Sequence, residues 1–166
     1  MPMGLSEASN ILWRQRHLLE LLLFKLDVEQ TLLAAGRLRW LARATNEVEM
    51  VLDEIRSIEL ARAVAVDDVA ASLGLGPGCS LRELAAAAPA PWDGILTEHR
   101  SAFLALTEEI SVVARANRDL VAHGQQSVAA VLDLVGDGTS PSPFDVARPG
   151  AATARRTSPL LVDEVV

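Results

Sequence analysis

Hydrophobic residues recur every three to four positions through most of the chain, and prolines divide this pattern into two long segments. All eight prolines lie outside residues 3–76 and 92–140, and elsewhere only short stretches separate one proline from the next. An interior proline costs a helix about 3 kcal/mol, so each proline-free segment predicts a long helix. The sequence therefore predicts an all-α protein built on two long antiparallel helices.

The first predicted helix begins near Leu5 or Ser6 and carries large apolar residues every seven positions. The series is Leu5, Leu12, Leu19, Leu26 and Leu33, and Trp40 continues it. A heptad series of this length is typical of a coiled-coil seam. Near Gly36 the pattern slips by one position and continues from Leu41 to Val69. The slip indicates either one helix with a bend near Gly36 or two helices broken there.

A short helix is predicted between the two long segments. The glycine-rich stretch 74–78 ends the first segment. Ser80-x-x-Glu83 then matches the capping box, in which each side chain bonds the other residue's backbone amide at a helix start. This helix is expected to run to about Ala88, where two nearby prolines stop it.

The last long helix is expected to begin at Trp92 or Asp93 and to end at Gly136. Two interleaved series form its seam: Leu96, Phe103, Ile110, Asn117, Gly124 and Val131, and Leu106, Val113, Leu120 and Leu134. Asn117 and Gly124 interrupt an otherwise apolar series. A buried Asn fixes register, and an interior Gly permits close approach of another backbone. This half of the helix therefore faces either a close helix crossing or a partner.

The composition changes at Gly136, and half of the prolines fall in the last 31 residues. Such a segment buries too little apolar area to offset its chain entropy. The sequence therefore predicts one helical domain over residues 1–135 and a disordered tail over residues 136–166.

Composition and charge exclude several classes of function. The net charge is −7 and the pI is near 4.9, which argues against nucleic-acid binding because phosphates require a cationic surface. No stretch approaches the roughly 18 consecutive apolar residues of a membrane span, and no secretory signal is recognisable. Cys79 is the only cysteine, which excludes an internal disulfide.

The sequence offers no catalytic, metal-binding or cofactor-binding constellation. Its three histidines are far apart, and none belongs to a Glu-x-x-His pair. His99 lies at a seam position and is interpreted as a structural histidine, and Cys79 as an inert loop cysteine. Glu49 and Asp53 lie one helical turn apart, so a helical metal-dependent hydrolase stays open as a minor alternative. The protein is predicted not to be an enzyme.

Surplus apolar surface points instead to binding. Residues 18–23 include five leucines, which cover more than one face of a helix. A two-helix hairpin covers one stripe of each helix, so the remainder must meet a third helix, a second subunit or a client protein. A coiled-coil homo-oligomer without a client is therefore an alternative.

The order of these motifs resembles the FlgN-type flagellar export chaperones over about residues 11–135. Four features carry the resemblance: the segment Leu21-Leu22-Leu23-Phe24-Lys25-Leu26 with Glu29-Gln30, Leu33 and Gly36; Leu73-Gly74-Leu75; Ser80-Leu81-Arg82-Glu83-Leu84; and Ala116-Asn117-Arg118-Asp119-Leu120. The resemblance implies a cytoplasmic chaperone that binds hook–filament junction proteins and delivers them to the flagellar export gate. It implies neither nucleotide nor metal.

The resemblance also suggests where these partners bind. The client site is expected on the last helix from about Ile110 to Leu134. Its members are Ile110, Val113, Asn117, Leu120, Val121, Gly124, Val128, Val131 and Leu134. The family places an aromatic residue, usually Tyr, beyond this helix to dock on the export gate. Phe144 is the candidate here.

Overall fold

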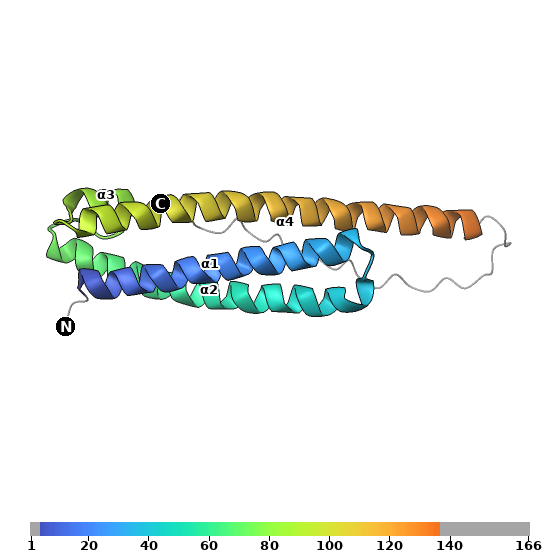
Figure 1. Ribbon diagram of the computed structural model, residues 1–166, viewed down its shortest axis with the longest axis horizontal. Helices are drawn as coiled ribbons and strands as arrows, with labels where there is room; N and C mark the ends of the chain where they lie inside the picture. Colours follow the sequence, from blue (N-terminus) through green and yellow to red (C-terminus); the bar gives the residue numbers. More distant parts are fainter. Residues whose placement is uncertain (1–3, 137–166) are drawn as a thin grey trace.

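The computed structural model describes residues 4–136, and all of its regular structure is helical (Figure 1). The helices are α1 (Leu5–Ala34), α2 (Leu38–Ser72), α3 (Leu81–Ala87) and α4 (Trp92–Gly136). The all-α prediction is confirmed, as are the starts of α1 and α4. The predicted tail lies outside the described residues, apart from Gly136 at the end of α4.

The chain reverses direction at Gly36, which decides between the two interpretations of the register slip. Gly36 has a φ of +66°, a backbone conformation that glycine adopts without strain. The Gly36 amide donates to the Leu33 carbonyl at 3.1 Å, and the Arg37 amide donates to the Leu32 carbonyl at 2.9 Å. These two bonds form a Schellman motif, which ends α1. The break gives three long helices where the two proline-free segments predicted two.

The same termination motif ends α2. Gly74 has a φ of +75°, and the Leu75 amide donates to the Ala70 carbonyl at 2.8 Å. The capping box predicted for α3 is present, because the Glu83 amide donates to Ser80 Oγ and the Ser80 amide donates to Glu83 Oε2. The Ser80 amide and the Ser80 hydroxyl both donate to the Glu83 carboxylate, which holds the pKa of this carboxyl below its ordinary value.

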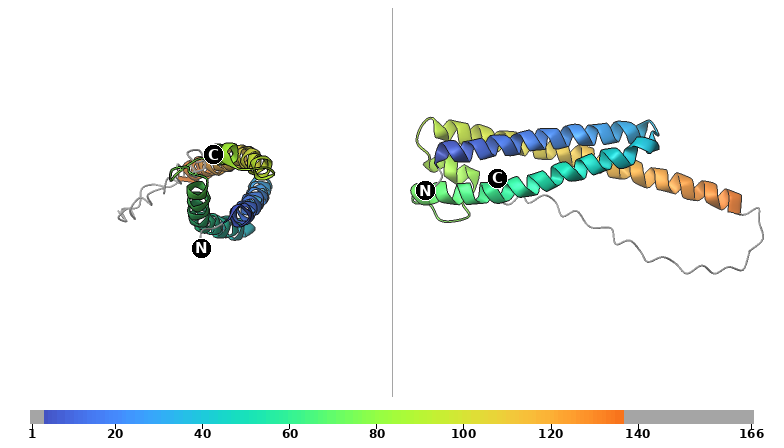
Figure 2. Two further views of the ribbon diagram at one scale, coloured as in Figure 1. Left: turned by 90° about the vertical axis from the view of Figure 1, so that its left-hand side faces the viewer. Right: turned by 90° about the horizontal axis from the view of Figure 1, so that it is seen from below.

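α1 is the helix against which the other two long helices pack. α2 runs opposite to α1, whereas α4 runs in the same direction as α1 (Figure 1). α1 packs closely on both, but no Cα atom of α2 lies within 8 Å of one in α4. α3 lies at the end where α4 begins and packs mainly on α4 (Figure 2).

The heptad series form the core, as the sequence predicted, except at Trp40. The series of α1 does not continue to Trp40, because this residue lies on α2 beyond the turn and is exposed. The fully buried large side chains include Leu12, Leu19, Leu22, Ile55, Val69, Leu96 and Phe103. Burial of one such side chain stabilises the fold by roughly 1.5–3 kcal/mol relative to exposure. Polar side chains are also buried at seam positions, among them Gln15 and Arg62. Burial lowers the pKa of the Arg62 guanidinium.

α4 is longer than the helices that cover it. It continues beyond the turn between α1 and α2 (Figures 1 and 2). Every residue from 118 to 135 is exposed, whereas the seam positions up to Asn117 are buried or half-buried. At 1.5 Å per residue, the 18 exposed residues correspond to about 27 Å of uncovered helix.

Candidate functional site

The uncovered end of α4 carries an apolar surface, here called the distal stripe. Its members are Leu120, Val121, Gly124, Val128, Val131 and Leu134. All are exposed. Earlier in α4, by contrast, the series that leads to Gly124 and Val131 is buried, and the series that leads to Leu120 and Leu134 is half-buried. An apolar stripe on a helix normally faces another element, so this one lacks its partner in the described chain.

The structure divides the nine residues that the sequence assigned to a client site. The six residues of the distal stripe are exposed. Ile110 is buried in the core, and Val113 is half-buried and packs against it. Asn117 is buried at the boundary between the covered and uncovered parts of α4.

A polar junction marks this boundary. Asn117 Nδ2 donates to the Leu26 carbonyl at 3.0 Å and to Glu29 Oε2 at 3.1 Å. The hydroxyl of Thr45 donates to Glu29 Oε1 at 2.7 Å. The Glu29 carboxylate therefore links all three long helices. The sequence assigned Asn117 to the client site and did not pair it with Glu29, which lies 88 residues earlier.

The distal stripe is nearly free of charge. Between residues 118 and 135, only Arg118, Asp119 and Asp133 carry formal charges at neutral pH. The His123 ring nitrogen Nδ1 donates to the Asp119 carbonyl at 2.7 Å, and the Ser127 hydroxyl donates to the His123 carbonyl at 3.0 Å. These polar side chains bond their own helix, so apolar contact is the main interaction that the stripe offers.

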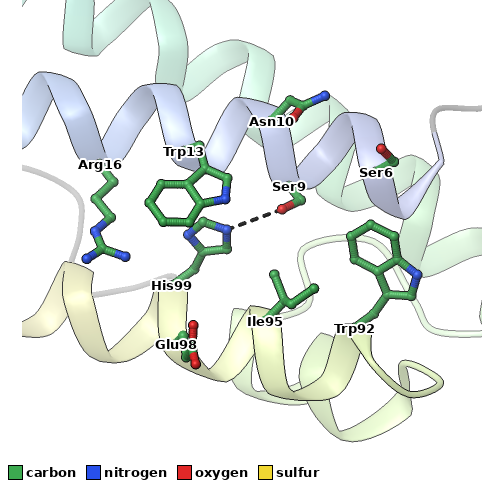
Figure 3. A pocket seen from close by; sticks show the side chains of 9 residues that line it. All are labelled: Ser6, Ser9, Asn10, Trp13, Arg16, Trp92, Ile95, Glu98 and His99. Carbon is green, nitrogen blue, oxygen red and sulfur yellow. Dashed lines mark hydrogen bonds between the residues drawn. The ribbon is translucent and has the colours of Figure 1, made fainter.

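A cavity of about 310 Å³ lies at the opposite end of the bundle, between α1 and α4 (Figure 3). Ser9 Oγ lies 3.3 Å from His99 Nε2, and both side chains are buried. The exposed ring of Trp13 meets His99 edge to face, with ring centroids 4.9 Å apart. The sequence predicted a structural His99 but not its partners, which come from another helix.

The Ser9–His99 pair lacks the features of a nucleophile and its base. Catalysis by such a pair needs an accessible hydroxyl and a third group that orients the imidazole. Ser9 is buried, and His99 Nδ1 has no hydrogen-bond partner among residues 4–136. Burial and the nearby Arg16 lower the pKa of His99. The pair therefore packs the end of the bundle, as the sequence interpretation of His99 proposed.

The carboxylate pair considered as a metal site lies on an open face of α2. Glu49 and Asp53 are both exposed, and Asp53 pairs with Arg56. Across the described part of the chain, no three histidine, cysteine or acidic side chains form a group suited to a metal. Cys79 is buried, and burial raises the pKa of its thiol, which disfavours the reactive thiolate.

Fold and surface together define a class: a helical bundle with an unpaired amphipathic helix end, typical of proteins that bind other proteins. The FlgN protein family matches residues 1–143. The chain belongs to the FlgN family. Members are flagellar export chaperones for hook–filament junction proteins and are not enzymes. The resemblance inferred from the motifs is thereby confirmed.

No curated protein and no solved structure matches the chain. Among the described helices, none combines the length and apolarity that crossing a membrane requires.

Proposed function

We propose that this chain binds hook–filament junction proteins through the distal stripe of α4. The observation that carries the proposal is the continuity of one heptad series across Asn117. Before Asn117, α1 covers the series, and beyond it the same series is exposed. An amphipathic helix of the client laid along the stripe would continue the packing that α1 provides, in the helix-in-groove mode of recognition.

Ile110, Val113 and Asn117 take a supporting role in this proposal. They fix the first part of α4 against α1 and so hold the distal stripe away from the bundle. They would contact the client only if this part of α4 gave up its contacts with α1 and packed on the client instead. Such an exchange would break the hydrogen bonds of Asn117 to Leu26 and Glu29, which opposes it.

Delivery of the client is the second part of the proposal. We assign docking on the export gate to Phe144, which lies outside the described residues, and the site of action to the cytoplasm. Both assignments rest on the family. A Phe144→Ala variant should keep its affinity for the junction protein and lose co-purification with the export gate. Unchanged co-purification would contradict the assignment.

A coiled-coil homo-oligomer is the second candidate, favoured by the width of the exposed surface. Besides the two seam series, Val121, Val128 and Val135 form a third exposed series beside them. A helix with three apolar series packs against more than one neighbour. Light scattering of the protein, alone and with a junction protein, distinguishes the two candidates. A stable oligomer that does not bind junction proteins would favour self-association.

The test of the client site is a double variant with a matched control. Leu120→Ala with Val131→Ala truncates side chains that are 37% and 58% exposed. Leu104→Ala with Val112→Ala makes the same changes on the covered half of α4, at 42% and 56% exposure. The first pair should weaken binding of a purified hook–filament junction protein at least tenfold, measured by calorimetry. The control pair should leave binding unchanged.

The melting temperature decides how a loss of binding is interpreted. Both double variants should melt within a few degrees of the parent protein, because surface truncations usually change stability by about 0.5 kcal/mol or less. Equal affinities for the two double variants would place the client site elsewhere.

A further inference from the structure

The turn between α1 and α2 carries a local excess of positive charge. Residues 30–46 contain three arginines and no acidic residue, although the whole chain has a net charge of −7. Arg43 pairs with Glu47 at 3.2 Å. Arg37 and Arg39 are exposed, and neither forms an ion pair within the described chain. The turn therefore presents two unpaired cations on an otherwise acidic protein.

Two large apolar side chains accompany these arginines. Leu38 is 66% exposed and Trp40 is 45% exposed. The Arg39 guanidinium lies over the Trp40 ring, 4.6 Å from the ring centroid. Tryptophan and arginine are enriched among the residues that dominate binding energy at protein interfaces. Residues 37–40, here called the basic turn, thus combine the side chains that suit recognition of an acidic protein segment.

The stability of α2 does not account for Arg37 and Arg39. Arg37 is the N-cap residue of α2 and makes no capping bond through its side chain, and the first turn of the helix contains no acidic residue. Positive charge is unfavourable at a helix N-terminus, because the aligned peptide dipoles already leave partial positive charge there. The two arginines thus oppose the local preference of the helix, as residues retained for binding do.

The basic turn lies level with the beginning of the distal stripe. Asn117 of α4 contacts Glu29 of α1, an offset of 88 residues, and the two helices run in the same direction. Gly36 in the turn is therefore level with Gly124 in the stripe. α4 passes the turn and continues beyond it (Figures 1 and 2). A client helix that continues the packing of α1 along the stripe would have one end against the basic turn.

We propose that the basic turn selects a client helix that carries acidic residues at the end next to the turn. This inference rests on the proposed function, because the client must lie on the distal stripe for its end to meet the turn. The stripe offers mainly apolar contact, which fits many amphipathic helices. Arg37 and Arg39 add charge complementarity, which contributes more to specificity and to the rate of association than to affinity. They are specificity-determining residues of the client site.

Other anionic occupants fit the basic turn less well. Attraction to an anionic membrane usually takes a cluster of roughly four to eight basic residues, whereas the basic turn has two unpaired arginines on a protein of net charge −7. The stripe of a second copy brings Arg118, Asp119 and Asp133 and hence little negative charge. The exposed acidic face of α2 around Asp53 is the remaining source of charge in a second copy, so the experiment includes the oligomeric state.

The experiment reverses the charge of the basic turn and, as a control, of two arginines far from it. The turn variant is Arg37→Glu with Arg39→Glu. The control variant is Arg14→Glu with Arg82→Glu, which changes the net charge by the same amount. Arg14 and Arg82 are likewise exposed and form no ion pair within the described chain. Both variants should melt within a few degrees of the parent protein, since glutamate is favourable at the start of α2.

Binding of a purified hook–filament junction protein is measured by calorimetry at about 0.05 M and about 0.3 M sodium chloride. At the lower concentration, the turn variant should bind at least tenfold more weakly than the parent protein, and the control variant less than threefold. Salt screens the attraction between opposite charges, so it should weaken binding of the parent protein more than binding of the turn variant. Equal weakening by the turn and control variants would show an effect of net charge alone and overturn the inference.

A charge swap on the client tests the contact itself. Each acidic residue in the client's binding helix is replaced in turn by lysine. At least one of these client variants should bind the turn variant at least tenfold more tightly than the parental client does. If none restores the affinity, selection by charge at the turn is overturned.

The outcomes separate this inference from the function on which it rests. Parental affinity of the turn variant, together with weak binding by Leu120→Ala with Val131→Ala, would overturn the role of the basic turn and leave the client site standing. Parental affinity of both would overturn the client site and the inference with it.

Two further outcomes would assign the basic turn to another occupant. One is binding of the parent protein, but not of the turn variant, to vesicles that contain about 30% phosphatidylserine, with client affinity unchanged. This result would assign the turn to a membrane surface. The other is a dimeric parent protein that the turn variant converts to monomers without a change in client affinity. This result would assign the turn to a second copy. Either result would overturn the inference.

Discussion

Two leucines at opposite ends of α4 provide the sharpest test of how this helix is divided. Leu96 is 0% exposed in the bundle, whereas Leu134 is 80% exposed on the distal stripe. Leu96→Ala and Leu134→Ala therefore make the same chemical change in the same helix. The two variants differ in how much of the leucine side chain is buried in the folded protein.

The expected magnitudes follow from burial. Truncation of a buried leucine to alanine costs about 2–5 kcal/mol, because a cavity is left as well as contacts being lost. Leu134 buries only a fifth of its surface, so its truncation should cost roughly 0.5 kcal/mol or less. For a domain of this size, 1 kcal/mol corresponds to a shift in melting temperature of about 3–5 °C. Leu96→Ala should therefore lower the melting temperature by roughly 6–25 °C, and Leu134→Ala by about 2.5 °C at most.

The assay is thermal and urea unfolding followed by circular dichroism at 222 nm. Urea unfolding with an unchanged slope would show that each variant changes stability and not the size of the unfolding unit. The reasoning is refuted if Leu134→Ala destabilises the protein as much as Leu96→Ala does. The end of α4 would then pack within the protein, and the distal stripe would not be free for a client.

Two further predictions concern the bundle. Gly36→Ala should cost about 1–2 kcal/mol, because alanine is strained at a φ of +66°, whereas Gly76→Ala in the next loop should cost less; equal urea midpoints would contradict this. His99 has a lowered pKa in the folded state, so near and below its ordinary value of 6.5 the unfolded state binds the proton more strongly. Stability therefore decreases as the pH decreases through this range. Urea midpoints at pH 7.5 and 5.5 should differ more for the parent protein than for His99→Gln, and an unchanged difference would contradict the assignment.

Local signals accounted for most of the elements. The capping box at Ser80 located the start of α3, and the prolines before Trp92 located the start of α4. Both signals act within one helical turn, which is why the sequence alone predicts them. The heptad series likewise predicted the buried positions of α1, of α2 and of α4 up to Asn117, because burial repeats with the period of the helix.

Features that depend on where the chain reverses direction could not be predicted from the sequence. A register slip at Gly36 is compatible with a bend and with a turn, and only the packing of α1 on α2 distinguishes them. The same turn fixes where α1 ends beside α4, and hence where the stripe becomes exposed. The interruptions of the α4 series at Asn117 and Gly124 are compatible both with a close helix crossing and with a stripe that faces a partner, so they do not locate the point of exposure. The contacts of Asn117 with Glu29 depend on the same arrangement.

The central position of α1 has a consequence for synthesis on the ribosome. α1 and α2 are neighbours in sequence and form a hairpin of local contacts, which fold quickly. The contacts of α1 with α4 join residues about 90 apart, such as Ser9 and His99. While α4 is still being made, the face of α1 that α4 later covers remains open to solvent. The nascent hairpin therefore exposes apolar side chains until the last long helix leaves the exit tunnel, the stage at which association with other chains competes with folding.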